Sequence, residues 1–520
     1  MGRSFASGLR FVGTWGLLAF ALAACGDDAP TVSPVLGGGV PEPASSDAIA
    51  GDFSGCNLVL ISLDTLRSDA LATYGADPGL GERLDRFAKE AVVFEHARSQ
   101  APQTAPSHMS LFTGMYPSVH GVQNVQHKLD TETGRREALI ESVPESLPLL
   151  AEVLSAGGYA TVALTDGGNL NPPHGFARGF DEFTKDLSGV EAQVADGLKH
   201  LSELRTSEQP FFLFWHTYEI HAPYVSPRSY MDLWSDESYD GELREIVDGL
   251  DGLEFRQRFA AMRTTFWANK AEFGPPEADY LKDLYEAGVD YTDQEIGALL
   301  DALDTPEARQ DTIVVILADH GEEFAEHGQW QHDQVYEECL RVPLMIRLPG
   351  GVGAGQRVQT PVALIDVMPT VLELLQVDRS ALPDRTVAPM QGLSLVPTLL
   401  TGVEPRNRPI YSEYRADRKG GPLFDWQVAV YFNDYKLIYN EHRSNREKGV
   451  ENLMLFNVKD DPDERQRLGS TEPRVLKGMT DSRDEYLKQI ELFQGLVGEG
   501  RAAELDEATR KDLEALGYLH

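Results

Sequence analysis

The stretch NLVLISLDTLRSD, residues 57–69, contains the pattern from which the fold class follows. It starts with an apolar run of strand length and continues directly into polar residues that include an Asp. The stretch TIVVILADHGEE, residues 312–323, repeats the pattern. Between these two stretches, short apolar runs alternate with helical patterns. We therefore predict an α/β fold with a mostly parallel sheet flanked by helices.

The regular elements of this sheet can be placed on the sequence. The apolar runs predict buried strands at residues 57–63, 159–165, 210–217, 312–318 and 342–348. Helical patterns occur at 147–156 and at 277–303, where apolar residues recur at three-to-four spacing. Residues 129–146 and 225–275 are acidic and show no clear periodicity, so we expect irregular insertions around a cleft.

The rhythm of the sequence changes beyond about residue 405. Four apolar runs without helices between them predict a small antiparallel sheet, at 410–414, 427–432, 435–440 and 454–458. Helical patterns follow at 474–497 and 506–516. We expect four segments in all: a signal peptide at 1–24, a tether at 25–55, a main α/β domain at 56–404 and a C-terminal subdomain at 405–520.

The N-terminus has the form of an export signal. Arg3 and Arg10 precede an apolar run, residues 11–24, which is too short to span a bilayer as a helix. The run ends in Leu-Ala-Ala-Cys at residues 22–25, which resembles the bacterial lipobox. The resemblance implies an exported protein that Cys25 anchors by lipid to the periplasmic or outer face of the cell envelope. An ordinary cleaved signal with an incidental Cys is the alternative.

Charge and cysteine content restrict the partners. The chain has 82 acidic residues against 46 Lys and Arg, a formal charge of -36, and we find no basic patch in it. This balance argues against a nucleic-acid partner and against charge-driven docking on anionic lipids. Besides Cys25, the chain contains Cys56 and Cys339, which an exported protein could join in a disulfide or keep as two thiols.

Polar residues after the strands predict a site. In an open parallel sheet, ligands bind beyond the carboxyl ends of the strands. Asp64 follows the first strand, and Asp319 and His320 follow the strand at 312–318. Two carboxylates and an imidazole from separate strand ends suit a divalent metal. Each of these residues alone could instead belong to a turn or cap a helix.

A hydroxyl group provides the third element of the site. In TAPSHMSLFTG, residues 104–114, Pro106 favours the first turn of a helix, so Thr104 should lie at a helix start that attracts anions. A metal that lowered the pKa of Thr104 would make it a nucleophile. Thr104 as a plain helix cap is the alternative.

Five strings, in this order, resemble the sulfatase family of the alkaline phosphatase superfamily over roughly residues 57–516. They are LDTLRSD, TAPSHMSLFTGMYPSVHGV, FWHTYEIHAPY, ADHGEEFAEHGQWQHDQVYEECLRVPLMIRLPG and LFNVKDDPDERQRL. The resemblance implies that Asp64, Asp319, His320 and Thr104 bind one divalent ion of calcium, magnesium, manganese or zinc. It also places Thr104 at the nucleophile position.

The resemblance implies further contacts with the substrate. His221 and His332 fall on positions that contact the anionic group or the leaving oxygen, so we expect them to be catalytic. His216, His108 and Asn124 are predicted to bind substrate, although His216 lies on an apolar strand, where a histidine is more often packed and hydrogen-bonded than catalytic.

The departures from the family pattern affect the chemistry. Sulfatases of the family have Cys or Ser, with Pro two residues on and Arg four residues on, and the Cys or Ser is oxidised to formylglycine. This chain has Thr104, Pro106 and His108, and Thr cannot become that aldehyde. The family's Lys and His after the GY-x-T strand are replaced by residues 166–169, Asp-Gly-Gly-Asn.

The sequence therefore predicts a metal-dependent hydrolase of anionic esters, sulfuric or phosphoric, that acts through Thr104. Its substrate would be a small molecule, a glycan or a lipid that carries the ester. Phosphoryl transfer through a phosphothreonine is chemically easier than sulfate hydrolysis, because a sulfated Thr would need attack at sulfur. The alternatives are a phosphotransferase of the phosphoethanolamine transferase kind and a binding lipoprotein without turnover.

Overall fold

The computed structural model describes residues 52–76, 78–124, 126–129, 136–269, 272–382, 388–417, 424–441, 453–498 and 502–503. The predicted signal peptide, Cys25, the tether as far as residue 51 and the predicted helix at 506–516 lie outside these residues. Within the described part of the tether, Phe53 is buried against the core of the main domain.

The main domain is built on an eight-stranded sheet with the strand order β14-β2-β13-β9-β1-β8-β6-β7. Its strands are β1 (Asn57–Leu63), β2 (Val92–Phe94), β6 (Ala160–Thr165), β7 (Glu182–Lys185), β8 (Phe211–Thr217), β9 (Thr312–Leu317), β13 (Leu344–Arg347) and β14 (Arg357–Val358). Strand β1 is parallel to both β8 and β9, and β6 is parallel to both β7 and β8. Strand β13 is antiparallel to β9 and β2.

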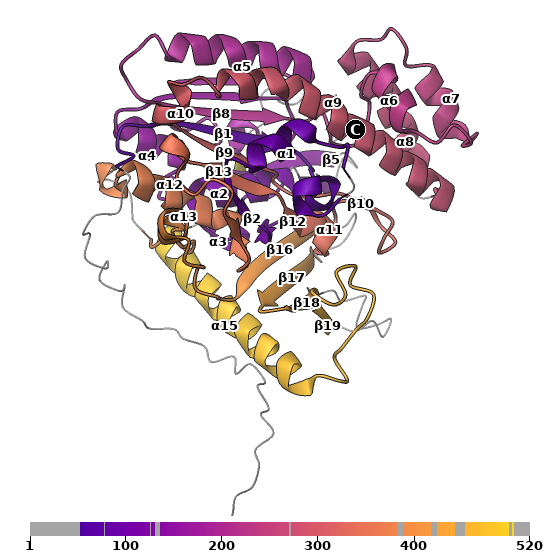
Figure 1. The fold of residues 1–520 in the computed structure, drawn as a ribbon. Helices are drawn as coiled ribbons and strands as arrows, with labels where there is room; N and C mark the ends of the chain where they lie inside the picture. The colour runs from indigo at the N-terminus through magenta and orange to yellow at the C-terminus, as the bar shows by residue number, and fades with distance from the viewer. Residues whose placement is uncertain are drawn as a thin grey trace, which may run out of the picture.

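Helices cover both faces of this sheet (Figure 1). Helix α5 and the long helix α9 lie along one face, and α2, α4 and α12 lie on the other. The bounds of the helices in the main domain are α1 (Glu82–Ala88), α2 (Thr104–Thr113), α3 (Pro117–His120), α4 (Leu150–Ala156), α5 (Val190–Leu204), α9 (Pro275–Ala302), α10 (Ala308–Asp311), α11 (Glu337–Leu340), α12 (Val367–Leu375) and α13 (Val396–Thr401).

The prediction of a mostly parallel sheet flanked by helices is confirmed. Strands β1, β8 and β9 are buried along their length, which explains their continuous apolar runs. The prediction that 225–275 is irregular is wrong, because these residues form α6 (Arg228–Trp234), α7 (Glu242–Asp248) and α8 (Phe255–Asn269) beside α9. Helix α8 has almost no amphipathic character, so its sequence shows no helical period.

The C-terminal region forms the predicted antiparallel sheet, in the order β16-β17-β18-β19. Its strands are β16 (Ile410–Asp417), β17 (Phe424–Phe432), β18 (Tyr435–Glu441) and β19 (Leu453–Asn457). Helix α15 (Pro473–Val497) packs against β17 and β18 and runs along the lower edge of the molecule in Figure 1. A second apolar core, separate from that of the main domain, lies between this sheet and α15.

The remaining strands are short or peripheral. They are β3 (Ala97–Arg98), β4 (Gln126–Leu129), β5 (Arg136–Glu141), β10 (Glu323–Phe324), β11 (Trp330–Gln331), β12 (Arg341–Val342), β15 (Val362–Ala363) and β20 (Ala502–Ala503). Cys56 and Cys339 are both free thiols, the first half-buried and the second buried. Within the described ranges, none of the helices combines the length and apolar character needed to cross a bilayer.

Candidate functional site

The predicted site residues meet at the carboxyl ends of the central strands. Asp64 follows β1, Asp319 and His320 follow β9, and Thr104 begins α2. All four side chains are buried. Gly321 continues the turn after His320 where a Cβ atom would lie 1.9 Å from the carbonyl oxygen of Glu338, so only glycine fits.

The backbone after β1 is strained in a way that supports the site. Thr65 has φ of 59°, an uncommon conformation for a β-branched residue. In this conformation the Thr65 N–H donates a hydrogen bond to Oδ1 of Asp319, at 3.3 Å. The His320 N–H donates to the same oxygen at 3.0 Å, so Oδ1 of Asp319 is held by two backbone donors.

Three possible ligand atoms, on Asp64, Asp319 and His320, lie close together; we call these residues the metal trio. Oδ1 of Asp64 and Oδ2 of Asp319 are buried without a hydrogen-bond donor among the described residues. Nε2 of His320 lies 3.8 Å from the first and 3.4 Å from the second. Because Nδ1–H of His320 donates to the carbonyl of Gly321 at 2.9 Å, Nε2 of the neutral ring carries the lone pair.

The electrostatics of this trio fit a divalent cation. Burial raises the pKa of Asp319 to about 7, and the neighbouring Asp64 contributes to this rise. Burial also raises the pKa of Asp64 well above its ordinary value, and it lowers the pKa of His320 to about 3. Two buried carboxylates beside a neutral imidazole are costly unless a cation compensates them. The donor set of two oxygens and one nitrogen suits such an ion.

Thr104 lies beside the trio. Its Oγ1 lies 3.5 Å from Oδ2 of Asp64 and 3.4 Å from Nε2 of His320. Oδ1 of Asn124 accepts a hydrogen bond from the N–H of Ala105 at 3.0 Å, which places Asn124 at the same helix start. The predicted neighbourhood of Thr104 and Asn124 is therefore present.

His221 and His332 form the next part of the site. Their Nε2 atoms are 3.1 Å apart, and the rings of His332 and His320 have centroids 4.4 Å apart. Nδ1–H of His221 donates to the carbonyl of Ala222 at 2.7 Å, so its Nε2 carries the lone pair. Burial and the adjacent His332 hold the pKa of His221 well below its ordinary value. Both imidazoles thus lie beside the metal trio.

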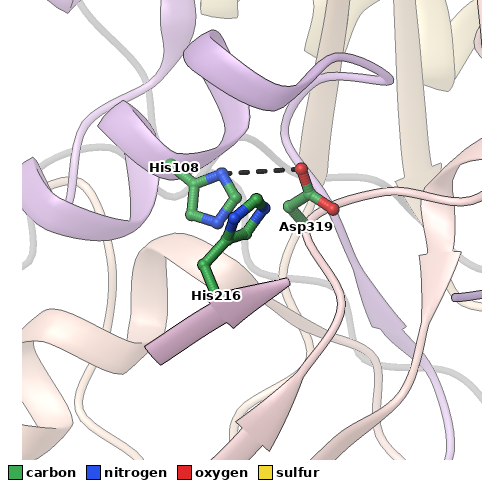
Figure 2. Close-up of side chains that lie close together, drawn as sticks. All are labelled: His108, His216 and Asp319. Atoms are coloured by element: carbon green, nitrogen blue, oxygen red, sulfur yellow. Dashed lines mark ion pairs between the residues drawn. The ribbon is translucent and has the colours of Figure 1, made fainter. Parts of the chain in front are cut away.

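His108, on α2, and His216, at the end of β8, lie next to each other beside Asp319 (Figure 2). Neither side chain has any solvent exposure. Nδ1 of His108 is 2.9 Å from the carbonyl oxygen of Thr104 and 3.5 Å from Oδ2 of Asp319. Nε2 of His216 is 3.2 Å from Oδ2 of Asp64. Burial lowers the pKa of each ring to about 4, so both are neutral at pH 7.

Two site neighbours were missed from the sequence. The hydroxyl group of Tyr218 donates to Nε2 of His221 at 3.0 Å, and Tyr218 stacks on the same ring. Its place in YEIHAPY, three residues before His221, is a signal that could have identified it. Asp166 accepts hydrogen bonds from the N–H groups of Ser188 and Tyr218, so it connects the loops that follow β6, β7 and β8.

Comparison with known proteins agrees with this geometry. The family profile described as Sulfatase matches residues 56–377, and the profile described as N-sulphoglucosamine sulphohydrolase, C-terminal, matches residues 325–487. The choline-sulfatase of Rhizobium meliloti is 25% identical over 501 residues, which cover 86% of this chain and 89% of that protein.

Solved structures show the same fold at lower identity. A protein in complex with its substrate D-glucosamine-2-N,6-O-disulfate matches with a TM-score of 0.63 and 19% identity, covering 84% of this chain and 98% of the other. The phosphonate monoester hydrolase of Agrobacterium radiobacter matches with a TM-score of 0.62 and 16% identity, covering 84% and 96%. With the profile spanning more than half of its length, the chain belongs to the sulfatase family of ester hydrolases.

Proposed function

We propose that the chain is a metal-dependent hydrolase of anionic esters that uses Thr104 as its nucleophile. The observation that supports this proposal is the position of Thr104. Its Oγ1 lies within 3.5 Å of both Asp64 and His320, at the start of a helix and beside two unpartnered carboxylate oxygens. Dependence on a divalent metal is a property of the family, and Asp64, Asp319 and His320 would hold the ion in this chain.

The metal would act as a Lewis acid that favours the ionised form of the nucleophile and neutralises charge on the ester. The chain's own groups supply the remaining chemistry. Thr104 attacks the central atom of the ester in line with the leaving oxygen. The His221–His332 pair takes up the proton that Thr104 loses, and the protonated pair then stabilises the charge that develops or protonates the leaving oxygen. Water then releases the acid from Thr104 in a second displacement.

The nucleophile favours a phosphoric or phosphonic ester. Formylglycine hydrate releases sulfate by breaking a carbon–oxygen bond, a route that a sulfated Thr lacks. A phosphothreonine, in contrast, can be hydrolysed by attack at phosphorus. The fold shared with a phosphonate monoester hydrolase is compatible with this choice, although at 16% identity it supports the fold alone.

Sulfate ester hydrolysis is the second candidate. It is supported by the similarity to choline-sulfatase over 86% of the chain. For either chemistry we propose a small-molecule, glycan or lipid ester as substrate. We also propose that the protein is exported and held at the cell envelope by a lipid on Cys25, on the basis of residues 1–25.

A substrate panel with adduct trapping tests the proposal. Purified protein is assayed with an aryl sulfate, a phosphate monoester, a phosphate diester and a phosphonate ester, each with calcium, magnesium, manganese or zinc. We expect turnover of a phosphorus ester and, after acid quenching, a phosphoryl or phosphonyl adduct on the peptide that contains Thr104. Diversion of product to an added alcohol would indicate a transferase.

The outcomes separate the candidates. Rapid aryl sulfate hydrolysis that persists in Thr104→Ala would refute the assignment of the nucleophile. Absence of turnover with every ester and metal would favour the binding lipoprotein.

A further inference from the structure

His216 lies against the metal trio without belonging to it. It is on β8, and the parallel pairing of β8 with β1 sets His216 opposite Ser62, two residues before Asp64. Its Nε2 is 3.2 Å from Oδ2 of Asp64, and both side chains are fully buried. As a metal ligand Asp64 is ionised and can only accept, so Nε2–H of His216 is the donor in this contact.

Because of this contact, the two carboxylate oxygens of Asp64 have different surroundings. Oδ2 is held by His216 and lies 3.5 Å from the Thr104 hydroxyl group, whereas Oδ1 has no donor among the described residues and faces His320. Asp319 shows the same division, with Oδ1 held by two backbone N–H groups and Oδ2 left toward His320. In each carboxylate, one oxygen accepts hydrogen bonds from the protein and the other is left for the metal ion.

The role of His216 becomes larger when Thr104 ionises. In the resting site, the Thr104 hydroxyl group also points at Oδ2 of Asp64, at the longer distance of 3.5 Å. A nucleophile that has given up its proton can no longer donate to this oxygen. His216 is then the remaining side-chain donor that the described residues offer to Asp64.

We propose that His216 is a positioning residue for the metal, which fixes Asp64 through Nε2–H so that Oδ1 faces the ion. In this proposal His216 contacts the metal ligand Asp64, whereas the sequence led us to expect a contact with the substrate. It rests on the metal site of the proposed function. Outer hydrogen bonds of this kind typically change metal affinity about 10- to 100-fold.

A second cation held by His108, His216 and Asp319 is a competing explanation. Ligand atoms of these three residues lie within 4.8 Å of one another, and Figure 2 shows them side by side. However, Nδ1–H of His108 donates to the carbonyl of Thr104, and Nε2 lies 2.9 Å from the hydroxyl group of Ser62. Both nitrogens of His108 are therefore engaged, and a single divalent ion in the metal trio would already balance Asp64 and Asp319.

Metal affinity tests the proposal without any assay of turnover. The variants His216→Phe, which lacks the donor, and His216→Gln, which keeps an N–H donor, are equilibrated with buffered metal and analysed by elemental mass spectrometry. We expect wild type to bind one ion, His216→Phe to bind it about 10- to 100-fold more weakly and His216→Gln to recover part of the loss. His174→Gln, at another buried histidine outside the site, is the matched control.

Two arms make the result decisive. In Asp319→Ala, unchanged binding would mean that the metal site itself is wrong, which separates that failure from failure of the role of His216. Wild-type affinity in both His216 variants would overturn the proposal, and so would a fall from two bound ions to one.

A measurement on wild type covers the case in which the variants do not fold. The ¹H–¹⁵N spectrum of histidine-labelled protein should show His216 with its proton on Nε2, both with metal and without. A metal-induced shift of a His216 nitrogen to the range of a direct ligand would refute the proposal.

Discussion

Replacing Thr104 by Val should separate chemistry from folding. Val keeps the branched shape of Thr and replaces the hydroxyl group by a methyl group. The hydroxyl oxygen of Thr104 approaches Asp64 at 3.5 Å and His320 at 3.4 Å, and both distances are longer than a good hydrogen bond from a hydroxyl group. We therefore expect the free energy of unfolding to fall by about 1 kcal/mol or less.

The effect on turnover should be far larger. A covalent route that loses its nucleophile typically falls by about 10⁴- to 10⁶-fold, which corresponds to roughly 5 to 8 kcal/mol of transition-state free energy. Thr104→Ser, which keeps a hydroxyl group, should retain much of the activity. A loss of transition-state free energy far larger than the loss of unfolding free energy would identify a chemical role for Thr104.

The matched control is Thr113→Val, at the other end of α2. Oγ1 of Thr113 donates to the carbonyl of Met109 at 2.6 Å and accepts from the N–H of Met115 at 3.2 Å. This variant should lose more stability than Thr104→Val and keep its turnover. The assays are urea unfolding followed by circular dichroism, and initial rates with the best ester of the panel. Retention of more than roughly a tenth of wild-type turnover in Thr104→Val would contradict the reasoning.

Two further predictions concern pH and location. Burial raises the pKa of Glu219 to about 8, so between about pH 4.5 and 8 the folded protein keeps a proton that the unfolded chain has released; the histidines titrate alike in wild type and in Glu219→Gln, so the comparison cancels them. Stability measured by urea unfolding should therefore fall between about pH 6.5 and 8, by about 2 kcal/mol more in wild type than in Glu219→Gln, and equal slopes would contradict this. In cell fractionation, wild type should partition with membranes and Cys25→Ala should not; a soluble wild type without lipid would end the anchor hypothesis.

The strand-end residues could be predicted because of how parallel sheets present their edges. The runs before Asp64 and Asp319 are apolar throughout, and a polar residue directly after such a run must lie at the carboxyl end of the sheet. Helix α9 could also be predicted from the sequence, because its buried residues recur at helical spacing.

The depth of His216 and His108 could not be predicted, because it depends on register. The alignment of His216 with Ser62 joins strands about 150 residues apart in sequence, and no local pattern encodes which residue of β8 stands beside which residue of β1. His108 illustrates the same limit. The helical pattern of α2 places it one turn after Thr104, but only the packed sheet reveals that this turn faces inward.

The strand order has a consequence for how the protein is made. Strand β1 lies between β8 and β9, which follow it in the chain by about 150 and 255 residues. During synthesis, this strongly apolar strand therefore exists for a long time with both edges unpaired, a condition that invites association with other chains. Strand β1 gains its second neighbour only when residue 312 has emerged. A ribosome that stalled before that point would release a chain prone to aggregation, so we expect the growing polypeptide to depend on a chaperone over most of its length.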